Sequence, residues 1–368
     1  MSYREFPCTS CGAELRFAPG TDALQCPYCG VLNEIESAPA EGAVGPHDER
    51  DYERTRRWLA HEGETLEAED RPAVKCTDCG AETSLPNPEI AGACSFCGSP
   101  VVYRGASTRL IKPQAVLPFK VTQREANEAF KKWVGNRWFA PSALKKDARG
   151  EVKPDGMYLP YWTYDARTHT RYSGQRGEWY YVNESYTTTV NGKRVQRTRR
   201  VRKTRWYPAG GRVRNAFDDL PVAASETLPR GFLHTLEPWD FGALDAYDDR
   251  FLAGFRAEHY TVALDDGFGI AADRMQPTID ATIRRDIGGD EQRITQKDTR
   301  YHDVTFKHVL LPLWISAYRF DGKTYRFLVN ARTGEVTGDR PYSKVKIGLV
   351  ILLVVLLIAL FVFLNSGG

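Results

Sequence analysis

The sequence predicts an α+β fold: two small four-cysteine modules, then a mostly antiparallel β domain with helices, then one apolar C-terminal helix. Three observations support this prediction. Eight cysteines form two identically spaced groups within the first 100 residues. Blocks of helical periodicity stand beside β-rich runs that are joined by turn residues. An uninterrupted apolar run lies just before the C-terminus.

The cysteines occur as four C-x-x-C pairs, and both groups have the spacing C-x2-C-x14-C-x2-C. Two intervening residues allow one tight turn to direct both sulfurs at a single ion about 2.3 Å away. Four thiolates complete a tetrahedral shell, which is the structural type of zinc site. Each group is therefore predicted to be a zinc ribbon with one structural Zn2+. The ligands are Cys8, Cys11, Cys26 and Cys29 in the first ribbon and Cys76, Cys79, Cys94 and Cys97 in the second.

Iron in the same thiolate cage, a redox-active C-x-x-C pair and disulfides are the alternative uses of these cysteines. The N-terminal residues contain no apolar segment typical of a cleavable secretory signal, so we expect a reducing compartment, where metal binding predominates. A segment of some 30 residues also has too small a core to fold alone, and zinc supplies on the order of 10 kcal/mol.

Composition along the chain indicates five regions. A Pro- and Gly-containing linker follows the first ribbon, and a highly charged stretch at 48–69 predicts a solvated helix. The predicted domains are residues 1–37 for ribbon 1, 38–71 for the linker and charged helix, 72–105 for ribbon 2, 106–343 for the α+β domain and 344–368 for the membrane anchor.

Two helical blocks are expected in the α+β domain. A capping box at 122–125 begins the first helix, and Trp138 and Phe139 are expected to extend its apolar surface. The second helix is expected at 263–287, with Pro277 causing a kink or a restart.

The strands of this domain are expected to form hairpins. Asn191-Gly192 lies between two β-rich runs, which is a strong hairpin signal. The Leu-Pro-x-Trp sequences at 159–162 and 311–314 are each expected to begin a strand, and they are related either by duplication or by chance. The predicted strands lie within 157–164, 177–190, 193–206 and 293–337.

No motif predicts an enzyme. Gly322-Lys323-Thr324 resembles the end of a phosphate-binding loop, but Ala317 stands where that loop needs glycine, and the β-rich flanks predict a hairpin turn. The seven histidines are scattered and form no metal or acid–base pattern. A net charge of +3 also excludes a polycation that coats nucleic acid with its whole surface.

One segment carries a strong local charge. On a strand, its alternating cations lie on both faces, so it cannot pack into a core. A phosphate backbone, anionic lipid and an acidic protein are the partners that it can attract, and a solvated edge that prevents aggregation needs no partner. Within 13 positions that contain no acid, the basic residues are Lys193, Arg194, Arg197, Arg199, Arg200, Arg202, Lys203 and Arg205.

The apolar run Ile347–Leu364 has 18 residues without a polar side chain. As a helix it extends about 27 Å, close to the roughly 30 Å hydrocarbon core of a bilayer. Arg340, Lys344 and Lys346 precede the run, and no basic residue follows it. We therefore expect a single-pass protein of the cell membrane that contacts lipid through 347–364, with the bulk of the chain in the cytoplasm.

The two cysteine groups, the stretch VTFKHVLLPLWISAYRFDGKTYRFLVNARTGEVTGDRPYS at 304–343 and the terminal apolar helix resemble a bacterial family of TFIIB-type zinc-ribbon membrane proteins. Its members are commonly labelled primosomal protein N-prime (replication factor Y) or phage replisome organiser. The resemblance covers nearly the whole chain and implies the zinc-ligand role for all eight cysteines. The helicase part of that label does not transfer, because the chain has no complete phosphate-binding loop and too little length for two motor lobes.

Some relatives in this family are associated with membrane-stress proteins of the SPFH-domain (flotillin-like) and phage-shock types. The resemblance therefore implies a non-enzymatic, membrane-anchored zinc-ribbon adaptor or scaffold, which recruits membrane-associated proteins at the cytoplasmic membrane face. The alternative is a membrane-tethered nucleic-acid-binding protein linked to replication, without a helicase motor. Under either hypothesis the eight basic residues of 193–205 are the candidate site for an anionic partner.

Overall fold

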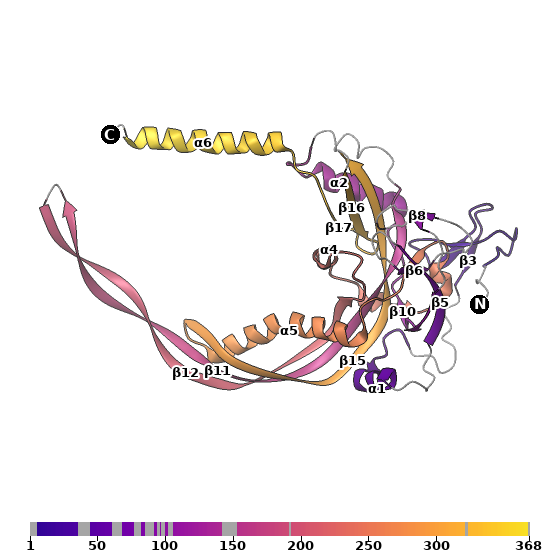
Figure 1. Ribbon diagram of the computed structural model, residues 1–368, viewed down its shortest axis with the longest axis horizontal. Coiled ribbons are helices and arrows are strands. Elements are labelled where there is room, and N and C mark those ends of the chain that lie inside the picture. Colours follow the sequence, from indigo (N-terminus) through magenta and orange to yellow (C-terminus); the bar gives the residue numbers. More distant parts are fainter. Residues whose placement is uncertain are drawn as a thin grey trace.

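The structure is a computed structural model, and it describes residues 6–35, 45–60, 68–76, 82–84, 92–93, 96, 100–101, 106–141, 153–190, 193–320 and 323–366. This part of the chain is α+β with a mostly antiparallel sheet, as the sequence predicts. Figure 1 shows a body from which a long hairpin and the C-terminal helix both extend toward the same side.

The centre of the large sheet has the strand order β12, β11, β15, β16, β17, and each neighbouring pair is antiparallel. These strands are β11 (Asp155–Val190), β12 (Lys193–Ala223), β15 (Glu291–Phe320), β16 (Lys323–Asn330) and β17 (Val336–Gly338). The pairs Val190↔Lys193 and Phe320↔Lys323 confirm both predicted hairpins.

Shorter strands complete this sheet and form two small ones. In the large sheet, β10 pairs with β15 and β14 pairs with β11 in parallel, and the remaining pairs are antiparallel. The short strands of the large sheet are β4 (Arg50–Asp51), β5 (Ala68–Lys75), β6 (Glu82–Ser84), β9 (Ala106–Ile111), β10 (Ala115–Val116), β13 (Asp245–Ala246) and β14 (Arg256–Glu258). The small sheets consist of β1 (Arg16–Phe17), β2 (Ala23–Gln25) and β3 (Leu32–Glu34), and of β7 (Gly92–Ala93) and β8 (Pro100–Val101).

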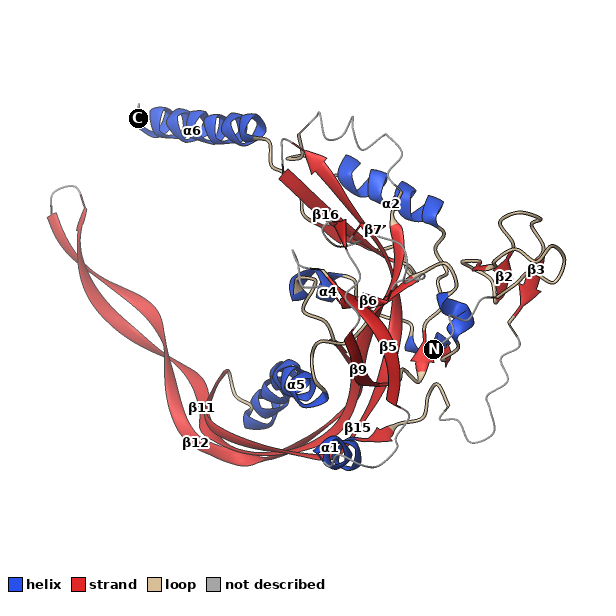
Figure 2. Cartoon of the chain, turned by 45° about the vertical axis from the view of Figure 1, so that its right-hand side comes forward, coloured by secondary structure: helices blue, strands red, loops and turns tan. Residues whose placement is uncertain are grey.

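Five α-helices and two short 3-10 helices are described. The α-helices are α1 (Tyr52–Ala60), α2 (Gln123–Gly135), α4 (Arg230–Thr235), α5 (Leu264–Ile287) and α6 (Lys344–Ser366). The 3-10 helices are η1 (Phe241–Ala243) and η2 (Asp249–Leu252). Figure 2 shows that α2 lies beside β16, whereas α5 lies inside the curve of the hairpin.

The charged helix predicted at 48–69 is shorter than expected. It occupies only α1, and β5 begins soon after it. Strand β5 pairs with β9, so this pairing crosses the predicted boundary at 105/106 between ribbon 2 and the α+β domain. Tyr52 and Thr55 of α1 are buried, and the Tyr52 hydroxyl donates to Asp265 Oδ1 on α5 at 2.7 Å. One face of this predicted solvated helix therefore packs on the body, and its other residues are mostly exposed.

The capping box of α2 is confirmed. Thr122 Oγ1 accepts from the Glu125 amide at 3.3 Å, and Glu125 Oε2 accepts from the Thr122 amide at 2.8 Å. Buried Phe130 stacks on Phe327 of β16 with ring centroids 3.7 Å apart, which fixes the helix on the sheet.

Trp138 and Phe139 do not extend the apolar surface of α2. The helix ends at Gly135, and the two side chains beyond it are 58% and 40% exposed. Their backbone contacts α6 instead, because Ser343 N donates to Phe139 O at 2.8 Å and Lys346 Nζ donates to Trp138 O at 3.0 Å.

Helix α5 runs without a break through Pro277, which is exposed, so a restart at that residue is wrong. Its buried residues face the hairpin at roughly four-residue spacing, as the 3.6-residue period requires. Gly267 allows the close approach, because a Cβ there would lie 2.5 Å from the Tyr164 hydroxyl oxygen. The buried face consists of Leu264, Gly267, Ala271, Met275, Ile279, Ile283 and Ile287.

The two Leu-Pro-x-Trp sequences lie inside strands rather than beginning them. Leu159 of β11 pairs with Leu311 of β15, so the sequences cross each other in adjacent antiparallel strands. The carbonyl of Pro160 accepts from the Ala224 amide, and the carbonyl of Pro312 accepts from the Ala331 amide. Both bonds lie on the edge of the strand that does not face the β11–β15 pairing. A residue in a strand directs its N and C=O to the same side, so each proline places its missing donor away from the β11–β15 ladder.

Burial falls along the hairpin in three stages. Both faces of β11 are buried over 157–164 in the body. From Ala166 to Tyr172 alternate side chains are buried under α5, and beyond Glu178 most are exposed. The strands predicted at 157–164 and 177–190 are thus parts of one strand, and the polar alternation between them hid the connection.

Candidate metal centre and basic hairpin

The first cysteine group forms a cluster in the N-terminal small sheet. The sulfurs of Cys8, Cys11, Cys26 and Cys29 all lie within 4.8 Å of one another. Cys8 Sγ is 3.6 Å from Cys29 Sγ, and Cys11 Sγ is 3.5 Å from Cys26 Sγ. Four sulfurs around one ion at about 2.3 Å are separated by about 3.8 Å in a tetrahedron, whereas a disulfide needs about 2.05 Å. The donor set therefore fits a metal ion and is not paired as disulfides.

Two matching turns position these sulfurs. The Gly12 amide donates to Cys8 O at 2.9 Å, and the Gly30 amide donates to Cys26 O at 3.0 Å. Both glycines have φ of +75°, which a residue with a Cβ rarely adopts. The glycine after each second cysteine is therefore required by the turn.

Backbone amides point at the sulfurs and change their acidity. The amide of Cys11 lowers the pKa of Cys8, and the amide of Cys29 lowers the pKa of Cys26 to about 6. The Ala13 amide favours the Cys11 thiolate, but the adjacent sulfurs outweigh it and raise the pKa of Cys11 to about 12. Neighbouring thiolates repel one another, so a cation among them is needed before all four can be charged.

The cysteine module shares its core with the body. Phe17 of β1 packs on Phe251 with ring centroids 5.4 Å apart, and its amide donates to Ala253 O at 2.9 Å. Leu15 and Leu24 belong to the same buried cluster as Phe119 of the body. Packing thus adds to whatever metal binding supplies to this small segment.

The second cysteine group lies mostly outside the described residues. Cys76 follows β5 and is buried. Cys79, Cys94 and Cys97 are not among the residues that the structure describes.

The basic segment forms the outer part of the hairpin, where only two strands remain. The third strand, β15, ends its pairing with β11 at Gly177↔Glu291. Beyond it 13 cross-strand pairs follow, from Glu178↔Arg205 to Val190↔Lys193, and at about 3.4 Å per residue they extend roughly 44 Å. All eight predicted basic residues lie in this free ribbon and are exposed, as the sequence predicts.

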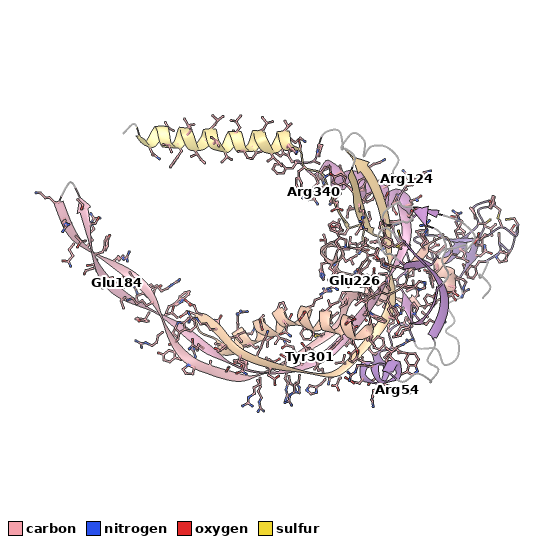
Figure 3. The ribbon with its side chains drawn as sticks, viewed as in Figure 1. Arg54, Arg124, Glu184, Glu226, Tyr301 and Arg340 are labelled. Atoms are coloured by element: carbon pink, nitrogen blue, oxygen red, sulfur yellow. The ribbon has the colours of Figure 1, made fainter. Side chains whose placement is uncertain are left out.

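The two faces of the free ribbon differ in chemistry. On one face, Arg202 stacks over Trp179 at 3.9 Å and Arg200 over Tyr181 at 4.2 Å, measured from the guanidinium carbon to the ring centroid. On the other face, Glu184 pairs with Lys203 at 2.9 Å and with Arg199 at 3.6 Å. Figure 3 shows Glu184 partway along the ribbon. Arginines also lie over rings on the second face, Arg199 over Tyr186 at 5.5 Å and Arg205 over Tyr180 at 5.1 Å, so the faces differ in how close these stacks are and in the Glu184 ion pairs.

Further cations lie at the base of the hairpin, where the sequence analysis did not place a site. They share the face that points away from α5, because their neighbours Thr168, Thr170 and Val213 are the residues buried under the helix. The signal was the period-two pattern R-x-H-x-R at 167–171 and R-x-R at 212–214. The exposed residues are Arg167, His169, Arg171, Arg212, Arg214, Arg300 and His302.

A second acidic group, Glu49, Asp165 and Asp219, already surrounds a cation. Lys307 is only 3% exposed, and its ammonium pairs with Glu49 and Asp219. Burial lowers the pKa of Lys307, but these two partners outweigh burial and raise it. Burial raises the pKa of Asp165 to about 6. The group is therefore an internal ion-pair network that joins β4 to the hairpin.

Helix α6 is long and apolar enough to cross a membrane, and none of its residues from Lys344 to Val362 is buried. The positively charged residues before the apolar run lie at its base, where Figure 3 labels Arg340. This finding supports the coarser expectation of one candidate membrane span at the C-terminus.

Comparison with known proteins gives one full-length likeness. The chain is 25% identical over 349 residues to the Uncharacterized protein YdjG of Bacillus subtilis (strain 168), covering 93% of this chain and 91% of that protein. No model of a protein family matches the chain, and no solved structure matches it.

Proposed function

We propose that the chain is a non-enzymatic, membrane-anchored adaptor that holds zinc ribbons and a basic hairpin at the cytoplasmic face of the cell membrane and recruits protein partners there. The free ribbon is the observation that carries this proposal. Its 13 pairs pack on no third strand and no helix among the described residues. An isolated two-stranded ribbon is at best marginally stable in water, so its extent indicates a role outside the fold.

Zn2+ is the ion proposed for the four-cysteine cluster. Four thiolates with no open position are the usual structural zinc shell, and they leave no place for a substrate. Zinc would then fix the module against the body, and the same role is proposed for the second group of cysteines.

Membrane anchoring is proposed from α6 and the charges before it. Arg340, Lys344 and Lys346 precede the span, which favours a cytoplasmic body. The family resemblance supports membrane-associated partners of the SPFH-domain or phage-shock type.

In-cell photocrosslinking tests the adaptor proposal. A photoreactive residue replaces Thr198 in the ribbon or, as the control, exposed Arg124 on α2. We expect Thr198 alone to crosslink membrane-associated proteins, and we expect a version that ends at Lys344 to become soluble and lose those crosslinks. Crosslinks from both sites alike, or from Thr198 to nucleic acid only, would contradict the adaptor role.

A second candidate function, tethered nucleic-acid binding, is favoured by one specific observation. The guanidiniums of Arg200 and Arg202 lie over aromatic rings on an exposed ribbon, and a guanidinium fits phosphate oxygens through its planar fork of donors. The triple variant with Arg199, Arg200 and Arg202 changed to Glu should then abolish duplex binding at low salt. Absence of any binding by the unmodified protein at low salt would end this candidate.

A further inference from the structure

The face of the hairpin that points away from α5 has its cations in register across three strands. Arg214 of β12 pairs with His169 of β11, which pairs with Arg300 of β15. Paired residues on adjacent strands point to the same side of a sheet. In the next row along the strands, Arg212 of β12, Arg171 of β11 and Asp298 of β15 lie side by side. Because α5 packs on the opposite side, this face is solvent-exposed and rigidly backed.

Most of this charge is not neutralised. Arg167 pairs with Asp303 at 3.7 Å, and both side chains are more than 70% exposed, so the pair is weak. Within the described residues, no ion pair involves Arg171, Arg212, Arg214 or Arg300. The rings of His169 and His302 lie between these arginines, 4.8 Å apart.

The same face continues into the free ribbon, and Glu291 is an acid on it that interacts with Arg202 and Arg293. The pairing of β11 with β12 keeps one register from Ala166 to Val190. Side chains two residues apart therefore stay on one face, which next presents Trp206 under Arg293 at 3.8 Å and then Trp179 under Arg202. We call this continuous surface the arginine face. It comprises Arg167, Arg171, Arg194, Arg200, Arg202, Arg212, Arg214, Arg293 and Arg300.

We propose that the arginine face binds the phosphate backbone of double-stranded nucleic acid, independently of its sequence. This inference deepens the second candidate function and does not depend on the adaptor role. All the charged donors of the face are guanidiniums or imidazoles, and a guanidinium presents a planar fork that fits phosphate oxygens. An arginine lies over one side of each of the rings of Trp179, Tyr181 and Trp206, which restricts stacking of these rings on bases.

The shape and composition of the face favour a duplex over other anions. The sheet curves so that this side is convex, and a flat bilayer would touch only its crest (Figure 1). Its three-stranded part exposes arginine, histidine, serine and aspartate, whereas the centre of a protein interface is depleted of charge. A two-stranded ribbon fits the major groove, which is about 12 Å wide.

A matched pair of triple variants tests the proposal with the full-length protein in detergent. The first changes Arg171, Arg212 and Arg214 to Gln on the arginine face. The control changes Lys193, Arg197 and Arg205 to Gln, which removes the same net charge from the opposite face of the ribbon. Affinity for a fluorescent 30-base-pair duplex is measured by anisotropy between low and high KCl. Thermal melting checks that both variants are folded.

We expect the first variant to lose duplex affinity by about tenfold or more, and the slope of log K against log salt to fall by about 3 (roughly 0.9 per lost phosphate contact). The control should change duplex affinity by less than about threefold, because its three cations lie on the opposite face of the ribbon from the arginine face. Equal losses in both variants would overturn the arginine face while leaving nucleic-acid binding in place. No duplex binding, with binding instead to phosphatidylglycerol vesicles or to polyglutamate, would overturn the face and the second candidate function together.

Discussion

At the residue scale, the ion pairs around Lys307 show how a cation can be buried in this fold. A buried ammonium is costly unless it is paired, and Glu49 and Asp219 supply the two partners. Asp165 stands beside them, and its Oδ1 accepts from the Asp219 amide at 2.7 Å. Asp219 has a left-handed backbone with a φ of +48°, and its amide is the one that donates to Asp165. A third carboxylate thus serves as a backbone acceptor in a site that already has enough negative charge.

Replacing Asp165 with Asn should stabilise the protein above pH 6. Burial raises the pKa of Asp165 to about 6 from an unfolded value of about 3.9, so the folded state binds the extra proton between these values. The charged form therefore costs stability above pH 6, and this cost disappears as pH falls toward 4. Asn keeps the acceptor oxygen without the charge. Because the side chain is only half-buried, we expect a gain below the 1.4 kcal/mol per pKa unit of a fully buried group.

Thermal unfolding of the Asp165→Asn variant at pH 8 and pH 4.5 measures this effect. The melting temperature should rise at pH 8 and rise clearly less at pH 4.5, where most of the cost of the charge is gone. Asp218→Asn is the control, because Asp218 is the exposed neighbour. An equal rise at both pH values would mean that charge is not the cause.

Substitution of a cysteine ligand should remove one metal ion. Cys26→Ser deletes a buried sulfur whose thiolate is favoured by its pKa of about 6, and three sulfurs no longer complete the tetrahedral shell. Metal content measured by mass spectrometry should fall by one ion per chain. Thr9→Ala serves as the control, because Thr9 lies in the turn between Cys8 and Cys11 and its hydroxyl donates to Asn33 Oδ1 rather than to a sulfur. Unchanged metal content in Cys26→Ser would contradict the assignment of this site.

At the element scale, the hairpin divides into a part that belongs to the core and a part that does not. The inner part contributes Tyr164 and Tyr172 to the cluster under α5, whereas the buried clusters of the described residues include none from the free ribbon. The ribbon is held by cross-strand hydrogen bonds, by arginine–aromatic stacks and by Glu291, whose Oε1 accepts from Trp179 Nε1 at 2.8 Å. Its removal should therefore leave the core intact.

Deleting 180–203 and closing the hairpin with Asn-Gly tests this division. We expect the melting temperature to change by no more than about 4 °C, the shift that roughly 1 kcal/mol produces in a domain of this kind. Binding of anionic partners should weaken strongly, because seven of the eight cations at 193–205 are removed. The Arg293–Trp206 stack at the edge of β15 remains as an internal check. A cooperative loss of the whole fold would show that the ribbon stabilises the core.

At the scale of the whole molecule, local chemistry was predictable and long-range pairing was not. The four cysteines, the Thr122 capping box and the Asn-Gly hairpin each depend on residues close in sequence. The Lys307–Glu49 pair joins residues 258 positions apart, and no local pattern reports it. The arginine face was missed for a similar reason, because it forms only when β15 pairs with β11 over 291–315.

The directions of α6 and the hairpin conflict with a planar bilayer. Both leave the body on the same side, so a membrane crossed by α6 in this pose would also enclose the ribbon (Figures 1 and 2). Each arginine in hydrocarbon costs about 3 kcal/mol by translocon insertion scales, and the ribbon has cations on both faces. We predict that the chain turns at 339–343 on insertion. Energy transfer between probes at Thr198 and Asn365 should then fall on transfer from detergent to nanodiscs, and unchanged transfer would contradict this turn.

A turn at 339–343 would break the hydrogen bonds that hold the start of α6 to the body, and it would allow the apolar side chains of α6 to enter lipid. Helix α6 now begins with three hydrogen bonds to the backbone of 138–140, from Ser343 N and from Lys346 Nζ. Such bonds contribute about 1 kcal/mol each, whereas one apolar side chain of this size gains about 1.5–3 kcal/mol on leaving water. The sixteen Val, Leu, Ile and Phe residues of 347–364 in lipid outweigh the three bonds many times over. The hydrogen bonds between the start of α6 and the backbone of 138–140 are thus expected only when no bilayer is present. Insertion of α6 into lipid would break them.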